Sequence, residues 1–301
     1  MSAIPLRPLG FGEVVDGAVQ IYRRDFGVYY LIALLGAVPG YVITLASGVD
    51  FSALALDNAG EPVERLGRMG AALGVIAIDA AISWVGMLAV AVAMAARIDE
   101  RGVSAGRAYR DALRHLPAAG GATVLALLLF LAVAFLVATA AMAPMALAMR
   151  SEGLLLPLLG ALVFLLAMVC MIGFWLAATF AIFPAVVIEG RGATGALRRS
   201  LQLCRGGWAR VTGIMVVALI VNLAPSYAVV ALFGMHDLFT SPEALGTVGP
   251  GRQWLLNTAD LLVGPLTAPF MVGAIMILFH DRRVRTEAYD LEARAGEMDA
   301  G

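Results

Sequence analysis

Long apolar stretches alternate with short polar segments along the whole chain. Six stretches are long enough to cross a bilayer, because about 20 apolar residues span its ~30 Å hydrocarbon core. They are Val28 to Ala46, Met69 to Ala96, Ala122 to Met149, Gly153 to Ile188, Val211 to Phe233 and Trp254 to Phe279. The fourth is unusually long and carries Pro184 near its end, so we expect it to tilt or kink. The pattern predicts an all-α, polytopic membrane protein with six transmembrane helices.

Three of the polar segments have the 3.6-residue period of an amphipathic helix. They lie at 11–26, at 105–116 after the candidate cap Ser104, and within 189–208. In the last segment Leu197, Leu201 and Cys204 share one face. The opposite face holds Arg198, Arg199, Gln202 and Arg205. We expect each helix to lie in the membrane interface with its apolar face towards the lipid.

The same order of elements recurs three times along the chain. Each amphipathic segment precedes two apolar stretches, and the motifs GAVQIYRR (17–24), GRAYRDAL (106–113) and GALRRSL (195–201) align loosely. Such recurrence indicates tandem structural repeats. We therefore predict a single membrane domain of three copies of an interfacial helix plus a transmembrane hairpin, at approximately 8–97, 98–190 and 191–286, with a cytoplasmic tail at 287–301.

Composition agrees with this architecture, and the distribution of charge orients it. Hydrophobic residues make up 61% of the 301 residues and charged residues 14%, against about 25% charged residues in soluble domains. Mean hydropathy is +0.87. All 21 basic residues are arginine, and seventeen of them fall in the N-terminal segment, at 97–116, at 189–210 and in the tail. By the positive-inside rule we predict cytoplasmic N- and C-termini. The net charge of −1 gives no reason to expect a nucleic-acid partner.

Two carboxylates interrupt the apolar stretches. Asp79 and Asp260 occupy comparable places in the second spans of the first and third repeats, at similar depth. A charged group inside a span costs about 2.5–3.5 kcal/mol on insertion scales, so such residues are candidates for function. One hypothesis is that both face one polar cavity with Asn222, Asn257 and Thr258 and bind a proton or cation. The alternative is that each reaches outer-face water or a hydroxyl such as Ser83 and is merely tolerated.

The arginines of the amphipathic segments are candidates for contact with lipid phosphate. A guanidinium meets two phosphate oxygens at once, and an interfacial helix holds it at headgroup depth. The candidate residues are Arg198, Arg199 and Arg205, with Arg107, Arg110 and Arg114 as their counterparts. The positive-inside rule alone would also explain these positions.

Glycine and proline mark places where the spans bend or approach closely. The sixth stretch contains Gly264, Pro265, Pro269 and Gly273, which predict a kinked helix. Gly36 with Gly40, and Gly70 with Gly74, have the GxxxG spacing that permits close packing of helices.

The sequence lacks the common catalytic and metal-binding motifs. It contains no HExxH, no GxSxG and no GxxxxGK, and its three histidines, His115, His236 and His280, are far apart. The two cysteines, Cys170 and Cys204, imply no disulfide framework, and we expect Cys204 to be buried. We therefore expect no catalytic residues, no metal site and no cofactor.

Three stretches together resemble a known membrane family. RPLGFGEVVDGAVQIYRRDF (7–26) resembles the entry helix, FPAVVIEGRGATGALRRSLQLCRGGW (183–208) the central elbow and FHDRRVRTEAYDLE (279–292) the exit tail of the glycerophosphoryl diester phosphodiesterase membrane-domain family. The resemblance implies a six-span protein of the bacterial inner membrane. It implies no catalytic residues, because the catalytic barrel of those phosphodiesterases is a separate domain that nothing here resembles.

Our first functional hypothesis is a non-enzymatic inner-membrane protein that binds membrane lipids or a membrane protein partner. The alternative is a small transporter or a proton- or cation-coupled carrier that uses Asp79 and Asp260. A third hypothesis is an integral lipid phosphodiesterase or transferase.

Overall fold

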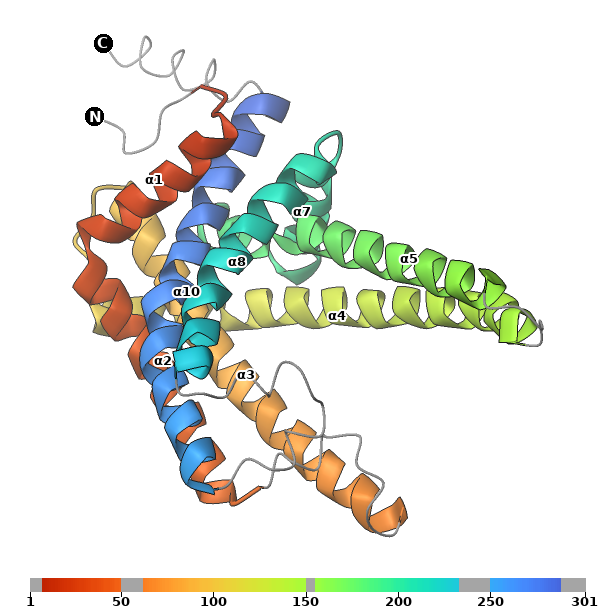
Figure 1. Cartoon of the computed structure of the whole chain (residues 1–301). Coiled ribbons are helices and arrows are strands. Elements are labelled where there is room, and N and C mark those ends of the chain that lie inside the picture. Colours follow the sequence, from red (N-terminus) through yellow and green to blue (C-terminus); the bar gives the residue numbers. More distant parts are fainter. Residues whose placement is uncertain (1–6, 50–61, 150–154, 233–249, 288–301) are drawn as a thin grey trace. The chain divides into compact units, whose positions relative to one another are not determined.

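The computed structural model describes residues 7–49, 62–149, 155–232 and 250–287, and within these ranges the regular secondary structure is helical (Figure 1). Its elements are α1 (Phe11–Arg24), α2 (Phe26–Ser47), α3 (Pro62–Ile98), α4 (Ala105–Met149), α5 (Leu155–Thr179), α6 (Ile182–Val187), α7 (Ala193–Cys204), α8 (Trp208–Leu232) and α10 (Pro250–Glu287). Several positions named above lie outside the described residues: His236, Arg150, the predicted span ends at Gly153 and Phe233, and the tail from 288.

Within the described ranges six helical segments are long and apolar enough to cross a membrane, which confirms the predicted all-α, polytopic architecture. They are Phe26–Ser47, Leu66–Ile98, Ala105–Ala140, Leu155–Val187, Trp208–Val229 and Trp254–Glu287. The chain is therefore a membrane-embedded protein.

Two helix boundaries show how neighbouring elements join. The second amphipathic segment is not a separate element, because α4 continues without interruption from Ala105 into the third apolar stretch. The fourth stretch breaks after Thr179, where α5 ends, and resumes as the short helix α6. Pro184 lies in the first turn of α6, where its missing N–H removes no helical hydrogen bond. The expected kink of the fourth stretch thus takes the form of a break.

Residues of the chain group into two compact units. Unit 1 comprises the described parts of 15–114 and 217–274, and unit 2 comprises the described parts of 4–14, 115–216 and 275–301. Each predicted repeat contributes residues to both units, so the units cut across the repeats. The repeat boundaries stay a prediction.

In unit 1 the helices α2 and α3 pack closely at two glycines. A Cβ added to Gly36 would lie 2.6 Å from the Cα of Gly86 and 2.9 Å from the Tyr109 hydroxyl. That hydroxyl donates a hydrogen bond of 2.7 Å to the carbonyl of Ile32. Gly70 and Gly74 have no neighbour within 4 Å of such a Cβ, so the second GxxxG pair makes no close contact among the described residues.

In unit 2 small side chains and hydroxyls join α4, α5, α7 and α8. The rings of Phe130 on α4 and Trp175 on α5 lie 4.9 Å apart, and these two helices run alongside one another in Figure 1. The Thr212 hydroxyl of α8 donates to the carbonyl of Gly173 at 2.7 Å. At the break before α6 the Ala181 N–H donates to the Ser200 hydroxyl of α7 at 3.1 Å. The break thus keeps its backbone satisfied by a buried side chain.

Candidate functional site

Unit 1 contains a cavity of about 500 Å³ between residues of α2, α3, α8 and α10. The four intramembrane polar residues predicted from the sequence, Asp79, Asn222, Asn257 and Asp260, all line it. Thr258 does not: its hydroxyl donates to the Trp254 carbonyl and lies 2.8 Å from the Tyr41 hydroxyl. The remaining polar lining side chains are Tyr41, Thr44, Ser83 and Ser226.

Asp79 lies against the backbone of α2. A Cβ on Gly40 would overlap its Oδ1 oxygen, so only glycine at position 40 leaves room for the carboxylate in this position. The GxxxG spacing of Gly36 and Gly40 predicted close packing of helices. In the structure the two glycines have different partners, since Gly36 faces Gly86 and Gly40 faces a carboxylate.

Asp260 and Asn222 belong to the opposite wall of the cavity. The Ser226 hydroxyl of α8 donates a 3.2 Å hydrogen bond to Asp260 Oδ1. Asn222 lies one helical turn before Ser226, and its Oδ1 is buried without a hydrogen-bond partner among the described residues. None of the described lining residues carries a positive charge. The cavity is therefore lined by two carboxylates, with no cationic side chain among the described lining residues.

The helices α8 and α10 of this wall continue without a break through their prolines, and the predicted kink of α10 stays a prediction. Hydroxyls of neighbouring helices bind carbonyls near these prolines. The Tyr22 hydroxyl donates to the Leu266 carbonyl at 2.5 Å, and Tyr30 makes a longer contact of 3.5 Å to the Leu262 carbonyl. These carbonyls lie three residues before Pro269 and Pro265 of α10. Proline removes the helical hydrogen bond to the carbonyl four residues earlier, so the tyrosines bind the carbonyls next to those that lose their donor.

The same arrangement occurs in α8. Its carbonyl at Asn222 lies three residues before Pro225 and accepts a 3.0 Å hydrogen bond from the Thr267 hydroxyl. Asn222 therefore takes part in helix contact through its backbone while its side chain lines the cavity.

The arginines predicted to contact lipid phosphate differ in their surroundings. Arg107, Arg110 and Arg114 are exposed at the start of α4, where Arg107 donates to the Ser104 hydroxyl and Arg114 pairs with Asp111. Arg198 and Arg205 are exposed on and after α7. These five residues keep the exposure that contact with a headgroup requires.

Arg199 corrects the prediction for α7. It is only 8% exposed, and its guanidinium is bound by the carboxylates of Glu189 and Glu287. The buried face of α7 consists of Ala196, Arg199, Ser200, Leu203 and Cys204, whereas Leu197 and Leu201 are only partly buried. The buried face is thus rotated from the predicted one, because an arginine neutralised by two carboxylates can be buried. Cys204 is buried as expected.

The partners of Glu189 determine its ionisation. Burial would raise the pKa of its carboxyl group, but hydrogen bonds from Arg199 and Arg191 outweigh burial and lower that pKa below the usual 4.5. The hydrogen bond to Glu287 raises the pKa of Arg199 in turn. Both groups are therefore charged at neutral pH.

Acidification is expected to weaken the cluster around Glu189. A carboxyl group whose folded-state pKa is lowered stabilises the fold fully above its unfolded-state pKa, here about 4.5, and loses this contribution as the pH falls through the folded-state value. Glu189→Gln should therefore reduce the drop in melting temperature between pH 7 and pH values below about 4.5. Melting is measured by circular dichroism, with the exposed Glu64→Gln as a control. Equal drops in melting temperature for the wild type and Glu189→Gln would contradict the stabilising role of the ionised Glu189 carboxylate.

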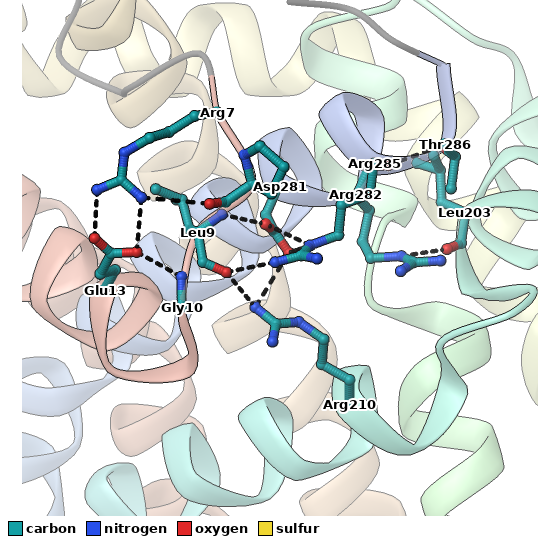
Figure 2. A network of polar contacts seen from close by, with 11 residues as sticks. Arg7, Leu9, Gly10, Glu13, Leu203, Arg210, Asp281, Arg282, Arg285 and Thr286 are labelled. Carbon is teal, nitrogen blue, oxygen red and sulfur yellow. Dashed lines mark hydrogen bonds and ion pairs between the residues drawn. The ribbon is translucent and has the colours of Figure 1, made fainter.

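A second network in unit 2, which the sequence did not reveal, is centred on Asp281 (Figure 2). Its side chain is fully buried and accepts hydrogen bonds from the Leu9 N–H at 2.8 Å and from Arg285 Nε at 2.9 and 3.0 Å. Arg210 lies 3.5 Å away. Arg210 and Arg285 each also donate to the Leu9 carbonyl at 2.6 Å. One carboxylate thus fastens the segment before α1 to α8 and to the end of α10.

Arg282, next to Asp281, joins the end of α10 to the end of α7. It is 5% exposed and donates to the carbonyls of Leu203 and Arg205 at 2.8 and 2.9 Å. A Cβ on Gly207 would lie 2.5 Å from one of its nitrogens, so a larger residue there would require the Arg282 side chain to shift. The three stretches that carry the family resemblance, 7–26, 183–208 and 279–292, therefore all contribute to the contacts around Asp281 and Arg282.

The start of α1 adjoins this network and is fixed locally. The Glu13 carboxylate accepts hydrogen bonds from the Gly10 N–H and from Arg7, as in one half of a capping box. Its hydrogen bond with Arg7, together with that from Gly10, lowers the pKa of Glu13 to about 2.

One family model matches the chain: that described as "Domain of unknown function (DUF7847)" matches residues 26–279. This range includes every residue that lines the cavity and ends before Asp281. No curated protein and no solved structure matches the chain.

Proposed function

We propose that this chain, which belongs to the DUF7847 family, binds a proton or a small cation between Asp79 and Asp260. It would carry this ion across the membrane. The observation behind this proposal is the shared cavity, in which both carboxylates occur without a cationic side chain among the described lining residues. An intramembrane carboxylate is costly unless it is neutralised. A bound proton or cation would supply the missing charge.

The prolines of the surrounding helices support a carrier more than a passive binding site. Pro265 of α10 lines the cavity, and α8 and α10 both contain prolines within continuous helices. Helices interrupted by proline or glycine recur beside substrate sites in transporters, and proline weakens a helix where it occurs. Under this proposal the protein is a non-enzymatic carrier.

The exposed arginines support a second proposal, which is binding of membrane lipids. Two groups of exposed arginines could contact headgroup phosphate. They are Arg198 and Arg205 on and after α7, and Arg107, Arg110 and Arg114 on α4. Arg199 is left out because its guanidinium is engaged by Glu189 and Glu287. The arginine distribution also supports a location in a bacterial inner membrane with both termini in the cytoplasm. The resemblance to the phosphodiesterase membrane-domain family supports the same location.

Flux in proteoliposomes tests the carrier. Purified protein is reconstituted with a pH-sensitive or sodium-sensitive dye inside, and uptake of protons or sodium is followed after a gradient is imposed. Asp260→Asn and Asp79→Asn should each lower the rate at least about tenfold, because each removes one of the two negative charges proposed to hold the cation, and a tenfold loss corresponds to about 1.4 kcal/mol. Asp16→Asn, an exposed acid on α1, is the control and should leave the rate unchanged. Equal rates for empty liposomes, wild type and both cavity variants would rule out the carrier.

A further inference from the structure

We infer that the cavity takes a small organic cation with a primary ammonium group, held by Asp79 and Asp260. This inference rests on the proposed function, because it specifies the cation that the same site would bind. Three properties of the cavity point to this class of ligand: its size, its hydrogen-bonding inventory and its apolar surface.

The size of the cavity fits a molecule better than a bare ion. Its volume of about 500 Å³ lies within the roughly 300–1,000 Å³ that is usual for small-molecule sites. A metal cation such as Ca²⁺ is instead surrounded by about six to eight oxygens at ~2.3–2.6 Å. Among the described residues no group of three or more His, Cys, Asp or Glu side chains could hold a metal ion. A cation of molecular size fills this space without such a cage.

The hydrogen-bonding groups of the cavity favour a ligand that donates. Asp260 Oδ1 accepts one hydrogen bond from Ser226, which leaves its second oxygen and both oxygens of Asp79 as further acceptors. The hydroxyl-bearing residues Tyr41, Thr44 and Ser83 line the same cavity and can also accept hydrogen bonds. An ammonium group has three donors and no acceptor, so it suits a lining rich in acceptors. A sodium ion or a quaternary ammonium group supplies charge but no hydrogen-bond donor.

The rest of the wall can hold a short hydrocarbon chain. Ala33 and Ala37 of α2, Ile76 of α3, and Leu223 and Leu261 of α8 and α10 line the same cavity. Ligand sites commonly combine such an apolar lining with a few polar groups that fix orientation. An alkylamine has both parts.

A series of ligands with one shared alkyl chain tests the inference on the full-length protein in lipid nanodiscs. The probes are butylamine, butyltrimethylammonium, butanol and sodium chloride, and the readouts are calorimetric titration and the shift in melting temperature. Butylamine should bind at least about tenfold more tightly than butyltrimethylammonium, since hydrogen bonds to charged groups contribute roughly that factor or more. Butanol should not bind measurably.

A variant assigns the binding to the carboxylates. Asp79→Asn keeps the size of the side chain but removes its charge, so it should weaken butylamine by at least about tenfold. Thr139→Val on α4, which lies outside the cavity, is the control. The comparison of ligands on the unmodified protein decides the question even where Asp79→Asn does not fold.

Each remaining outcome is informative. Equal affinity for butylamine and butyltrimethylammonium would overturn the inference, because the donors of the ammonium group would not matter. Asp260-dependent flux of protons or sodium without butylamine binding would also overturn it while leaving the proposed carrier intact. Absence of both the flux and the binding would overturn the inference and the proposed function together.

Discussion

Replacing Asp281 by alanine is expected to lower the free energy of unfolding by about 3–5 kcal/mol, the range found when one partner of a buried ion pair is removed. The carboxylate is fully buried and neutralises Arg285 and Arg210. Its loss leaves these guanidinium groups without a counter-charge and the Leu9 N–H without its acceptor. The segment before α1 would then be held mainly by the two arginine bonds to the Leu9 carbonyl.

Denaturant titration of the purified protein in mixed micelles, followed by circular dichroism, measures the effect of Asp281→Ala. Asp111→Ala is the matched control, because it also removes an aspartate paired with an arginine, but both partners are exposed. Exposed pairs contribute little, so the control should stay within about 0.5 kcal/mol of the wild type. If the two variants lose the same stability, the Asp281 network does not hold unit 2 together.

Replacing Gly36 by alanine is expected to force α2 and α3 apart. The new Cβ would lie 2.6 Å from the Cα of Gly86, which is backbone and cannot rotate away. It would also press on the Tyr109 hydroxyl and disturb its bond to the Ile32 carbonyl. Overpacking of this kind lowers the free energy of unfolding by about 1–3 kcal/mol and sometimes more. Denaturant titration in mixed micelles, followed by circular dichroism, measures the loss.

Gly74→Ala on α3 is the control for Gly36→Ala. A Cβ at this position meets nothing within 4 Å among the described residues. Alanine also favours the helix by up to about 1 kcal/mol over glycine, so the control should unfold at the same or a slightly higher denaturant concentration. A loss of stability in both variants would show that glycine itself, rather than the contact with Gly86, determines the effect.

The spans were predictable because bilayer thickness sets their length, whatever they pack against. The first stretch was predicted at Val28 to Ala46 and the helix runs from Phe26 to Ser47. The start of α4 was less accessible to sequence reasoning. Pro117, Gly120 and Gly121 suggest a break, yet the helix is continuous there. Gly121 packs on Ala193 and the neighbouring Ala119 and Ala122 are buried, so tertiary packing outweighs weak helix propensity.

The candidate site was predictable in its members but not in its contacts. Similar depth in two spans was enough to associate Asp79 with Asp260. Depth does not determine which side chain faces which helix, so the contact with Gly40 could not be predicted. The sequence did not indicate the burial of Asp281, because an acidic residue among arginines at the end of a span is usually exposed to solvent. Its burial depends on Leu9, which is far away in sequence.

The hydroxyl bonds to the proline-bearing turns connect several helices. Tyr22 and Tyr30 come from α1 and α2, yet the carbonyls that they bind belong to α10. In lipid no water is at hand to replace a bond that breaks. Each of these carbonyls can also accept the N–H of the residue four positions later, so the tyrosines add a second contact to the helical bond. Within unit 1 the side chains of α1 and α2 thus tie these helices to the α10 part of the cavity wall.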